Sequence, residues 1–108
     1  MKLPRATHFT ITEIVNYEDL GFARPGEGHR LAEAGVTRLG GDLPVNTSGG
    51  LKSCGHPIGA SGVRMVNNVV DQLLDRAGAM QVRGARTGLA HNLGGPGAVA
   101  AVAILGAA

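Results

Sequence analysis

The stretch from about Ala60 to Ala77 constrains the fold more than any other, because it reads as a helix that is apolar on more than one side. Apolar residues at helical spacing form one stripe on it: Val63, Val66, Val70, Leu73 and Ala77. A second set widens that stripe: Met65, Val69 and Leu74. Such a helix is covered by more than one layer. In a chain of 108 residues, we expect one of those layers to come from elsewhere.

The C-terminal segment AVAAVAIL (98–105) points the same way. It is almost purely apolar and does not alternate, which favours a strand that is buried on both faces. The preceding residues, GLAHNL and GGPG, read as a strand and a tight turn. The run is too short to span a bilayer, so we expect no membrane partner.

The remaining segments complete an α/β pattern. FTITEIVNYEDLG predicts a helix with Thr10 as N-cap, Glu13 completing a capping box and Gly21 at its end. PGEGHRLAEAG predicts a short second helix. LGGDLPVNTSGG reads as extended, and its proline makes it an edge strand at best. The predicted order is therefore ααβαββ in one α/β domain that spans residues 1–108.

Composition excludes several classes of function. The chain is 44% hydrophobic and 17% charged, which supports a core rather than disorder. Its net charge of +2 is spread out and has no aromatic interleaving, so we expect no nucleic-acid partner. The four histidines and one cysteine show no ligand spacing, and we expect no metal site. With no apolar signal segment, the expected location is the cytoplasm or an organelle matrix.

The glycine-rich stretch GGLKSCGHPIGASG (49–62) lies directly ahead of the apolar helix. Within it, the glycine before His56 opens space and Pro57 fixes the backbone direction. A histidine at the approach to a helix can donate a hydrogen bond to a developing oxyanion or help to keep a nearby thiol ionised. A histidine that merely caps a turn fits the same residues. Cys54 reads as an inert packing residue and His29 as a surface residue.

Taken together, these segments resemble the C-terminal half-domain of a thiolase of the sterol-carrier-protein, or lipid-transfer, type. Five stretches carry the resemblance: TITEIVNYEDLGF, GEG (26–28), LPVNTSGGLKSCGHPIGASG, DQL (71–73) and GLAHNLGGPGAVAAVAIL. The resemblance implies one part of a five-layer αβαβα sandwich built from two half-domains. It also implies a longer enzyme that acts on acyl-CoA, by Claisen condensation or thiolysis of 3-ketoacyl-CoA, as a homo-oligomer.

By the same resemblance, His56 is the catalytic histidine that contacts the thioester oxygen and the reactive cysteine. His91 stands where many thiolases carry an acid/base cysteine. Backbone and side-chain groups near the substrate carbonyl are implied at Gly55, Asn92, Gly94 and Gly95. Coenzyme A enters as a thioester substrate, and no separate cofactor is implied. The nucleophilic cysteine belongs to the N-terminal half-domain, so we expect that half-domain or a second subunit as partner and an isolated chain without activity.

The largest departure from the family pattern is at the start. Lipid-transfer-type thiolases typically read His-Asp-Cys-Phe before the first helix, whereas this chain reads Ala6-Thr7-His8-Phe9. His8 in place of the cysteine can still shuttle protons, because histidine titrates near neutrality. Two alternatives therefore stay open: a thiolase-like retro-aldolase subunit, and a non-catalytic module that binds an acyl ligand or a partner.

Overall fold

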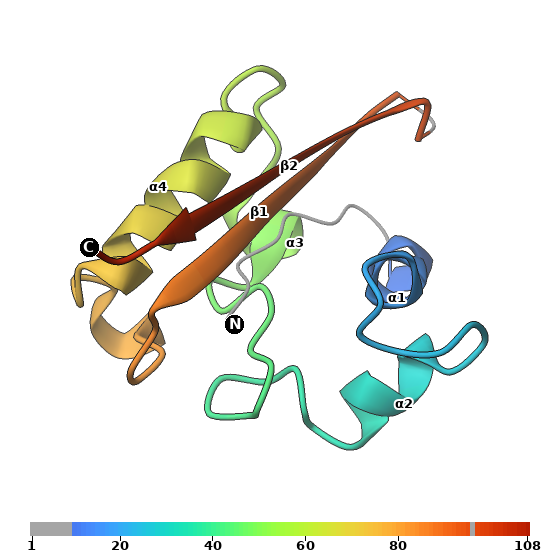
Figure 1. Cartoon of the computed structure of the whole chain (residues 1–108). Coiled ribbons are helices and arrows are strands. Elements are labelled where there is room, and N and C mark those ends of the chain that lie inside the picture. Colours follow the sequence, from blue (N-terminus) through green and yellow to red (C-terminus); the bar gives the residue numbers. More distant parts are fainter. Residues whose placement is uncertain (1–9, 96) are drawn as a thin grey trace.

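The computed structural model describes residues 10–95 and 97–108. Its described part is a small α/β domain, as predicted, in which helices surround one two-stranded antiparallel sheet (Figure 1). The α-helices are α1 (Thr10–Asp19), α2 (Gly28–Glu33), α3 (Gly50–Cys54) and α4 (Ser61–Leu73). A 3₁₀ turn, η1 (Gly78–Met80), precedes the strands β1 (Thr87–Gly94) and β2 (Val99–Gly106).

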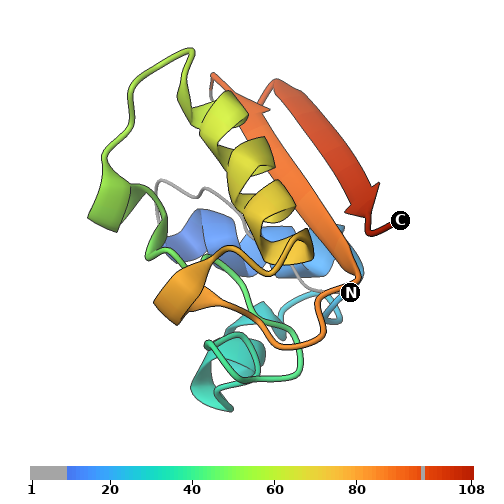
Figure 2. The same ribbon diagram turned by 90° about the vertical axis from the view of Figure 1, so that its left-hand side faces the viewer.

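Strand β1 is the centre of the domain, because helices cover both of its faces. Side chains alternate along a strand, so Leu89 and Ala90 face opposite sides. Ala90 packs with Met65 and Val69 of α4, whereas Leu89 packs with Tyr17 of α1 in a second cluster. Figures 1 and 2 show α4 and α1 on opposite sides of the strand pair. The two small cores therefore lie on opposite faces of β1.

Helix α4 buries only part of the predicted apolar surface, and two polar residues besides. The residues that it buries are Ser61, Met65, Val69 and Gln72. Of the predicted stripe, Val66 and Leu73 flank this core, but Val63 is 62% exposed. The spacing of apolar residues did not predict that the polar residue Gln72 is buried. Its burial is favoured by its hydrogen bonds. Its side chain accepts from the Val82 amide (2.8 Å) and donates to the Met80 carbonyl (2.7 Å), which satisfies its polar atoms.

The segment before α3 does not form the predicted strand, although Val45 in it makes a single β-bridge. The Leu43 and Val45 amides donate to the Val36 and Thr37 carbonyls, so the backbone closes a local loop instead of pairing with the sheet. Gly49 and Gly50 then adopt positive φ angles (85° and 65°) at the start of α3. Glycine adopts this left-handed conformation at little cost. The glycines that suggested a turn after a strand therefore begin a short helix.

Glu18 organises the connection from α1 to α2. Its carboxylate accepts hydrogen bonds from the Gly26 and Gly28 amides, both at 2.9 Å. These two backbone hydrogen bonds hold the pKa of Glu18 below its ordinary value. Gly28 is packed so closely against α1 that a Cβ there would lie 2.4 Å from the Ile14 carbonyl oxygen. The GEG motif at 26–28 is thus explained by packing and by this hydrogen-bonded turn.

Glu13 also differs from its predicted use. Thr10 is the first helical residue of α1 and not the residue before it. The Glu13 carboxylate accepts hydrogen bonds from the Tyr17 hydroxyl and from Asn46 Nδ2, the latter at 3.0 Å. This contact ties α1 to the loop that leads into α3, and so helps to place the glycine-rich stretch.

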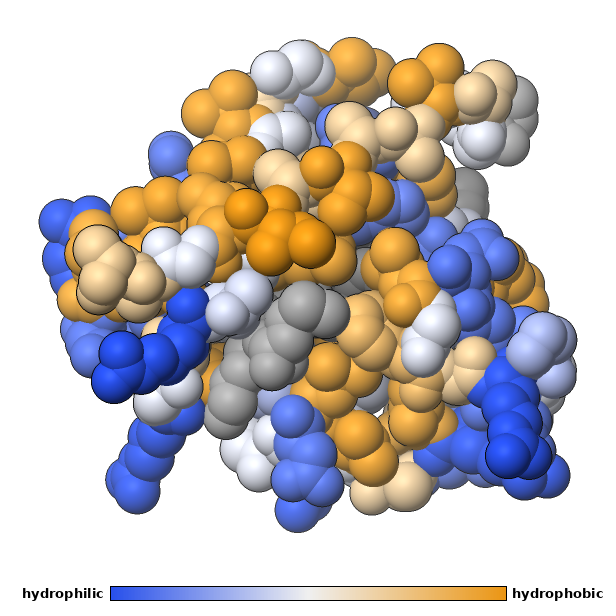
Figure 3. Space-filling view, in the orientation of Figure 1, coloured by the Kyte–Doolittle hydropathy of each residue, from blue (hydrophilic) through white to orange (hydrophobic). Residues whose placement is uncertain are grey.

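Strand β2 is exposed along almost its whole length. Val99, Val102 and Ile104 are 67%, 50% and 65% exposed, and only Leu105 packs partly against the α4 core. Figure 3 shows hydrophobic surface along the strand pair. The exposure expected for a chain lacking one layer is therefore present at β2. Val69 of the helix is fully buried within the chain, so it is not part of this exposed surface, whereas Val102 is.

Candidate functional site

The loop between α3 and α4 carries His56. Helix α3 ends at Cys54, and Gly55 follows with a φ of 71°, which turns the backbone away from the helix. All residues from Gly55 to Ala60 are exposed, and Ile58 is 90% exposed. The loop therefore presents both an imidazole and an apolar side chain on the surface, immediately before the N-terminus of α4.

Ser61 fixes the imidazole ring of His56. His56 Nδ1 lies 2.7 Å from Ser61 Oγ. Ser61 is the first residue of α4 and only 3% exposed, so the hydroxyl is held by its surroundings. The ring is thus attached to the start of a helix, where the helix dipole gives a partial positive charge.

Arg64 fixes the backbone on which His56 stands. Its guanidinium donates from Nη1 to the Cys54 carbonyl (2.9 Å) and from Nη2 to the Gly55 carbonyl (2.8 Å). These carbonyls belong to the two residues directly before His56. Arg64 is one turn into α4, so both the ring and the preceding backbone of His56 are held by the same helix.

Asn92 approaches the same helix end from strand β1. Asn92 Nδ2 lies so close to Gly62 that a Cβ on that glycine would be 3.3 Å from it. Gly62 follows Ser61, so the structure brings the predicted substrate-contact residue Asn92 next to the element that holds His56.

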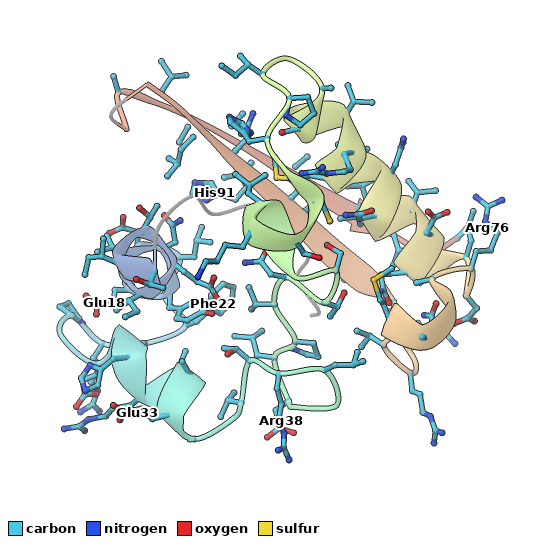
Figure 4. The ribbon with its side chains drawn as sticks, turned by 180° about the vertical axis from the view of Figure 1, so that it is seen from behind. Glu18, Phe22, Glu33, Arg38, Arg76 and His91 are labelled. Carbon is cyan, nitrogen blue, oxygen red and sulfur yellow. The ribbon has the colours of Figure 1, made fainter. Side chains whose placement is uncertain are left out.

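His91 lies on the other face of β1. It is 7% exposed and alternates with Asn92, so it shares the face of Leu89 rather than that of Ala90. Figure 4 shows His91 between the strands and helix α1. The structure therefore places one candidate histidine on the α1 side of the strand, while His56 is attached to α4. His8, the third candidate, lies outside the described residues.

The remaining candidates differ in their surroundings. Gly94 is the last residue of β1, and the exposed Gly95 follows with a φ of 57°. Cys54 is exposed and its sulfur lies 3.6 Å from the Ser48 carbonyl, so the expectation of a packing residue is wrong. His29 is exposed, as expected.

Neither a metal centre nor a membrane span is found in the part of the chain that the structure describes. Among those residues, no three histidine, cysteine, aspartate or glutamate side chains gather to hold a metal ion. Among the same residues, no helix is both long and apolar enough to cross a bilayer. A small cleft of about 100 Å³ lies beside the C-terminal half of α4 and is lined by Thr47, Asp71 and Arg76, among others.

Sequence reasoning missed Ser61 and Arg64. A serine five residues after a histidine is too common a spacing to identify a contact. The arginine acts on backbone carbonyls, which leave no trace in the sequence. The only available signal was the position of both residues in the first turns of a helix that follows a glycine-rich loop.

Curated relatives of this chain are much longer proteins. It is 54% identical over 96 residues to an acetyl-CoA acetyltransferase of Methanothermobacter thermautotrophicus, which covers 89% of this chain and 25% of the relative. It is 44% identical over 91 residues to sterol carrier protein 2 of Homo sapiens, which covers 84% of this chain and 17% of the relative. The chain thus spans a quarter or less of these proteins.

The fold has a counterpart among solved structures. The chain superposes on the "Ltp2-ChsH2(DUF35) aldolase" with a TM-score of 0.78 over 98% of its own length and 26% of that chain. The sequences are 24% identical, so this likeness shows the fold alone. The family described as "Thiolase C-terminal domain-like" matches residues 7–107. Because that match covers nearly the whole sequence, the chain belongs to the thiolase C-terminal domain-like family.

Proposed function

We propose that this chain is the C-terminal half-domain of an acyl-CoA thiolase, in which His56 stabilises the thioester oxygen during Claisen condensation or thiolysis. Residues 1–108 then form one domain of a longer enzyme, or one subunit, that acts in the cytoplasm. Coenzyme A enters as a thioester, and no resident cofactor is needed. The acetyl-CoA acetyltransferase relative and the family match support this reaction class.

The single observation that carries the proposal is the way in which His56 is held. Its ring is exposed, yet Ser61 fixes one ring nitrogen and Arg64 fixes the preceding backbone. A histidine that only capped a turn would need no such support from a second side chain. A pre-organised N–H donor stabilises negative charge better than water, because it does not have to reorient as the charge develops.

The chemistry assigns a definite role to such a donor. In thiolysis a cysteine thiolate of the partner half attacks the 3-keto carbonyl, and the C2–C3 bond breaks. The bond's electron pair moves into the thioester, whose oxygen becomes negative, and C2 then takes up a proton. His56 donates a hydrogen bond to that oxygen, and coenzyme A thiolate later removes the acyl group from the cysteine.

The partner in this proposal is the N-terminal half-domain. The chain covers 25% of the length of its acetyltransferase relative, so most of such an enzyme lies outside the described structure. The exposed valines and isoleucine of β2, at Val99, Val102 and Ile104, offer an apolar surface for it. Ile58, on the His56 loop, is exposed as well, so apolar surface also lies beside the proposed site.

A retro-aldolase subunit is the second candidate, and one observation favours it. The only cysteine of the chain is Cys54, so histidines replace thiols at both family acid/base positions, His8 and His91. Retro-aldol cleavage needs a base for the substrate hydroxyl and an oxyanion donor, but no acyl-accepting thiol. The two reactions are separated by offering the complete assembly a 3-ketoacyl-CoA with coenzyme A, and then a 3-hydroxyacyl-CoA without it.

The decisive experiment is His56→Ala in the complete assembly. We expect kcat to fall by roughly two to three orders of magnitude, about 3–4 kcal/mol, with a much smaller change in KM. His56→Gln keeps an N–H donor near the position of Nε2 and should retain more activity than alanine. His29→Ala, which removes another exposed imidazole, is the matched control and should leave both constants unchanged.

If the His56→Ala variant turned over substrate nearly as fast as the parent protein, His56 would be only a turn residue and the proposal would be contradicted. The isolated 108-residue chain should show no thiolysis of acetoacetyl-CoA at all, because the acyl-accepting cysteine lies in the partner.

A further inference from the structure

We infer that Ser61 is a positioning residue that fixes the tautomer of His56, so that the neutral ring carries its proton on Nε2. The inference rests on the proposed function, because the tautomer matters only if Nε2 serves as a donor. It assigns a chemical task to a buried hydroxyl that neither the sequence pattern nor the family match identifies.

The first step concerns where the single hydroxyl proton of Ser61 points. Two acceptors lie within reach: His56 Nδ1 at 2.7 Å and the Pro57 carbonyl at 3.3 Å. That carbonyl already accepts the Ala60 and Ser61 backbone amides, at 3.0 and 3.1 Å. The shorter distance and the satisfied carbonyl both favour donation to Nδ1.

The second step follows from imidazole chemistry. In a neutral ring one nitrogen donates and the other accepts. With Nδ1 accepting from Ser61, the proton resides on Nε2, which is then a donor without any need for the ring to be charged. The opposite tautomer would leave a lone pair on Nε2, and that lone pair would repel a developing oxyanion.

The third step is that the hydroxyl is well fixed. Ser61 is 3% exposed and its amide is bonded to Pro57, so the Cα of Ser61 cannot shift without disturbing the first turn of α4. Arg64 holds the Cys54 and Gly55 carbonyls from the same helix. His56 and Ser61 therefore move together, and the contact persists when α4 moves as a body.

The test is a double-mutant cycle in the complete assembly. Ser61→Ala should lower kcat by roughly ten- to a hundredfold when His56 is present, with KM changed less than about twofold. In a His56→Gln background the same serine change should alter kcat less than about twofold, because an amide N–H donor has no tautomer to set. A merely structural role would produce equal losses in both backgrounds, and that result would overturn the inference.

A second measurement needs no change at Ser61, so it decides even where Ser61→Ala does not fold. The complete protein is labelled with ¹⁵N-histidine, and the ¹⁵N chemical shifts of the imidazoles are recorded at a pH at which the rings are neutral. These shifts report which of the two ring nitrogens carries the proton. Protonation of His56 at Nε2 supports the inference, and protonation at Nδ1 overturns it. Failure of the proposed function would appear separately, as unchanged turnover of His56→Ala alone.

Discussion

Strands β1 and β2 have the same length and pair along all of it, yet one is buried and the other is not. Residues Gly88 to His91 of β1 are buried, whereas every residue of β2 except Leu105 is exposed. Hydrogen bonding is therefore not what buries a strand here. Side chains of α4 cover one face of β1 and the Tyr17 cluster covers the other, and on β2 the α4 cover reaches only Leu105.

The comparison teaches that an apolar composition and full pairing with a neighbour do not by themselves bury a strand. The residues of β2 are as apolar as those of a central strand, although the chain itself supplies almost no cover for them. Burial of apolar area contributes on the order of 25 cal/mol per Å², so this face favours association with whatever layer fits it.

The largest expected effect comes from one matched pair of substitutions. Leu89 and Ile104 are register partners in the ladder, but Leu89 is 3% exposed and Ile104 is 65% exposed. Leu89→Ala should lower the free energy of unfolding of the chain by about 2–5 kcal/mol, because it leaves a cavity between β1 and α1. Ile104→Ala should change it by less than about 0.5 kcal/mol. Urea unfolding followed by circular dichroism measures both.

Equal losses at the two positions would break the comparison, since they would mean that β2 is covered in the isolated chain. The comparison of the two strands becomes sharper when both substitutions, Leu89→Ala and Ile104→Ala, are repeated in the complete assembly. There, Ile104→Ala should become costly if the proposed partner layer covers β2.

The next effect concerns association. Val102 is half exposed at the middle of β2, so Val102→Lys should leave the fold of the isolated chain intact while placing a charge in the expected contact. We expect the lysine variant to lose self-association, or binding to the partner half-domain, at micromolar concentration. Sedimentation velocity measures this loss. Lys52, exposed on α3, offers a control position where exchange to glutamine should have no effect.

The smallest expected effect is the pH dependence of stability at Glu18, which belongs to the α1–α2 side of the domain that packs on the Leu89 face of β1. The pKa of Glu18 is lowered by the Gly26 and Gly28 amides, so the ionised carboxylate stabilises the folded chain at pH above its ordinary value of 4.5. That contribution is lost as the pH falls through the lowered pKa. Glu18→Gln should therefore destabilise the chain at neutral pH and differ less from the parent in acid. Thermal unfolding between pH 7 and about pH 3 checks this.

A stability gap between Glu18→Gln and the parent that widened in acid would contradict the assigned sign. Hydrogen exchange adds a spatial check. The glutamine variant should loosen amides on the α1–α2 side before those of α4.

Much of the fold was predictable because periodicity and turn residues agree over long segments. The helices at α1 and α4 were predicted from helical spacing, with capping residues at α1, and the strand pair at the end was predicted from its apolar runs and the turn between them. The prediction of a strand before α3 was wrong, because Gly49 and Gly50 can begin a helix as readily as they can follow a strand. The prediction of the buried face of α4 was only partly right, since Gln72 is a core residue that no hydrophobic pattern would select.

The sequence indicated the candidate histidine of the site but not the side chains that hold it in place. A histidine between glycine and proline at a helix approach indicated His56. The Ser61 and Arg64 contacts depend on side-chain directions at the start of α4. The separation of His91 from Asn92 follows from the alternation of side chains along β1. The burial of His91 depends on the cover of that face by α1, which the sequence does not specify.

The adjacency of His91 and Asn92 also limits how this chain can change by insertion or deletion. Because one residue of shift exchanges the two faces of a strand, a single deletion within residues 87–90 would carry the imidazole to the α4 side and the amide to the α1 side. A deletion in the exposed turn after Gly94 would leave both in place. A change in the length of that turn therefore leaves both side chains on their own faces, whereas the length of β1 ahead of His91 is constrained by the two layers that β1 separates.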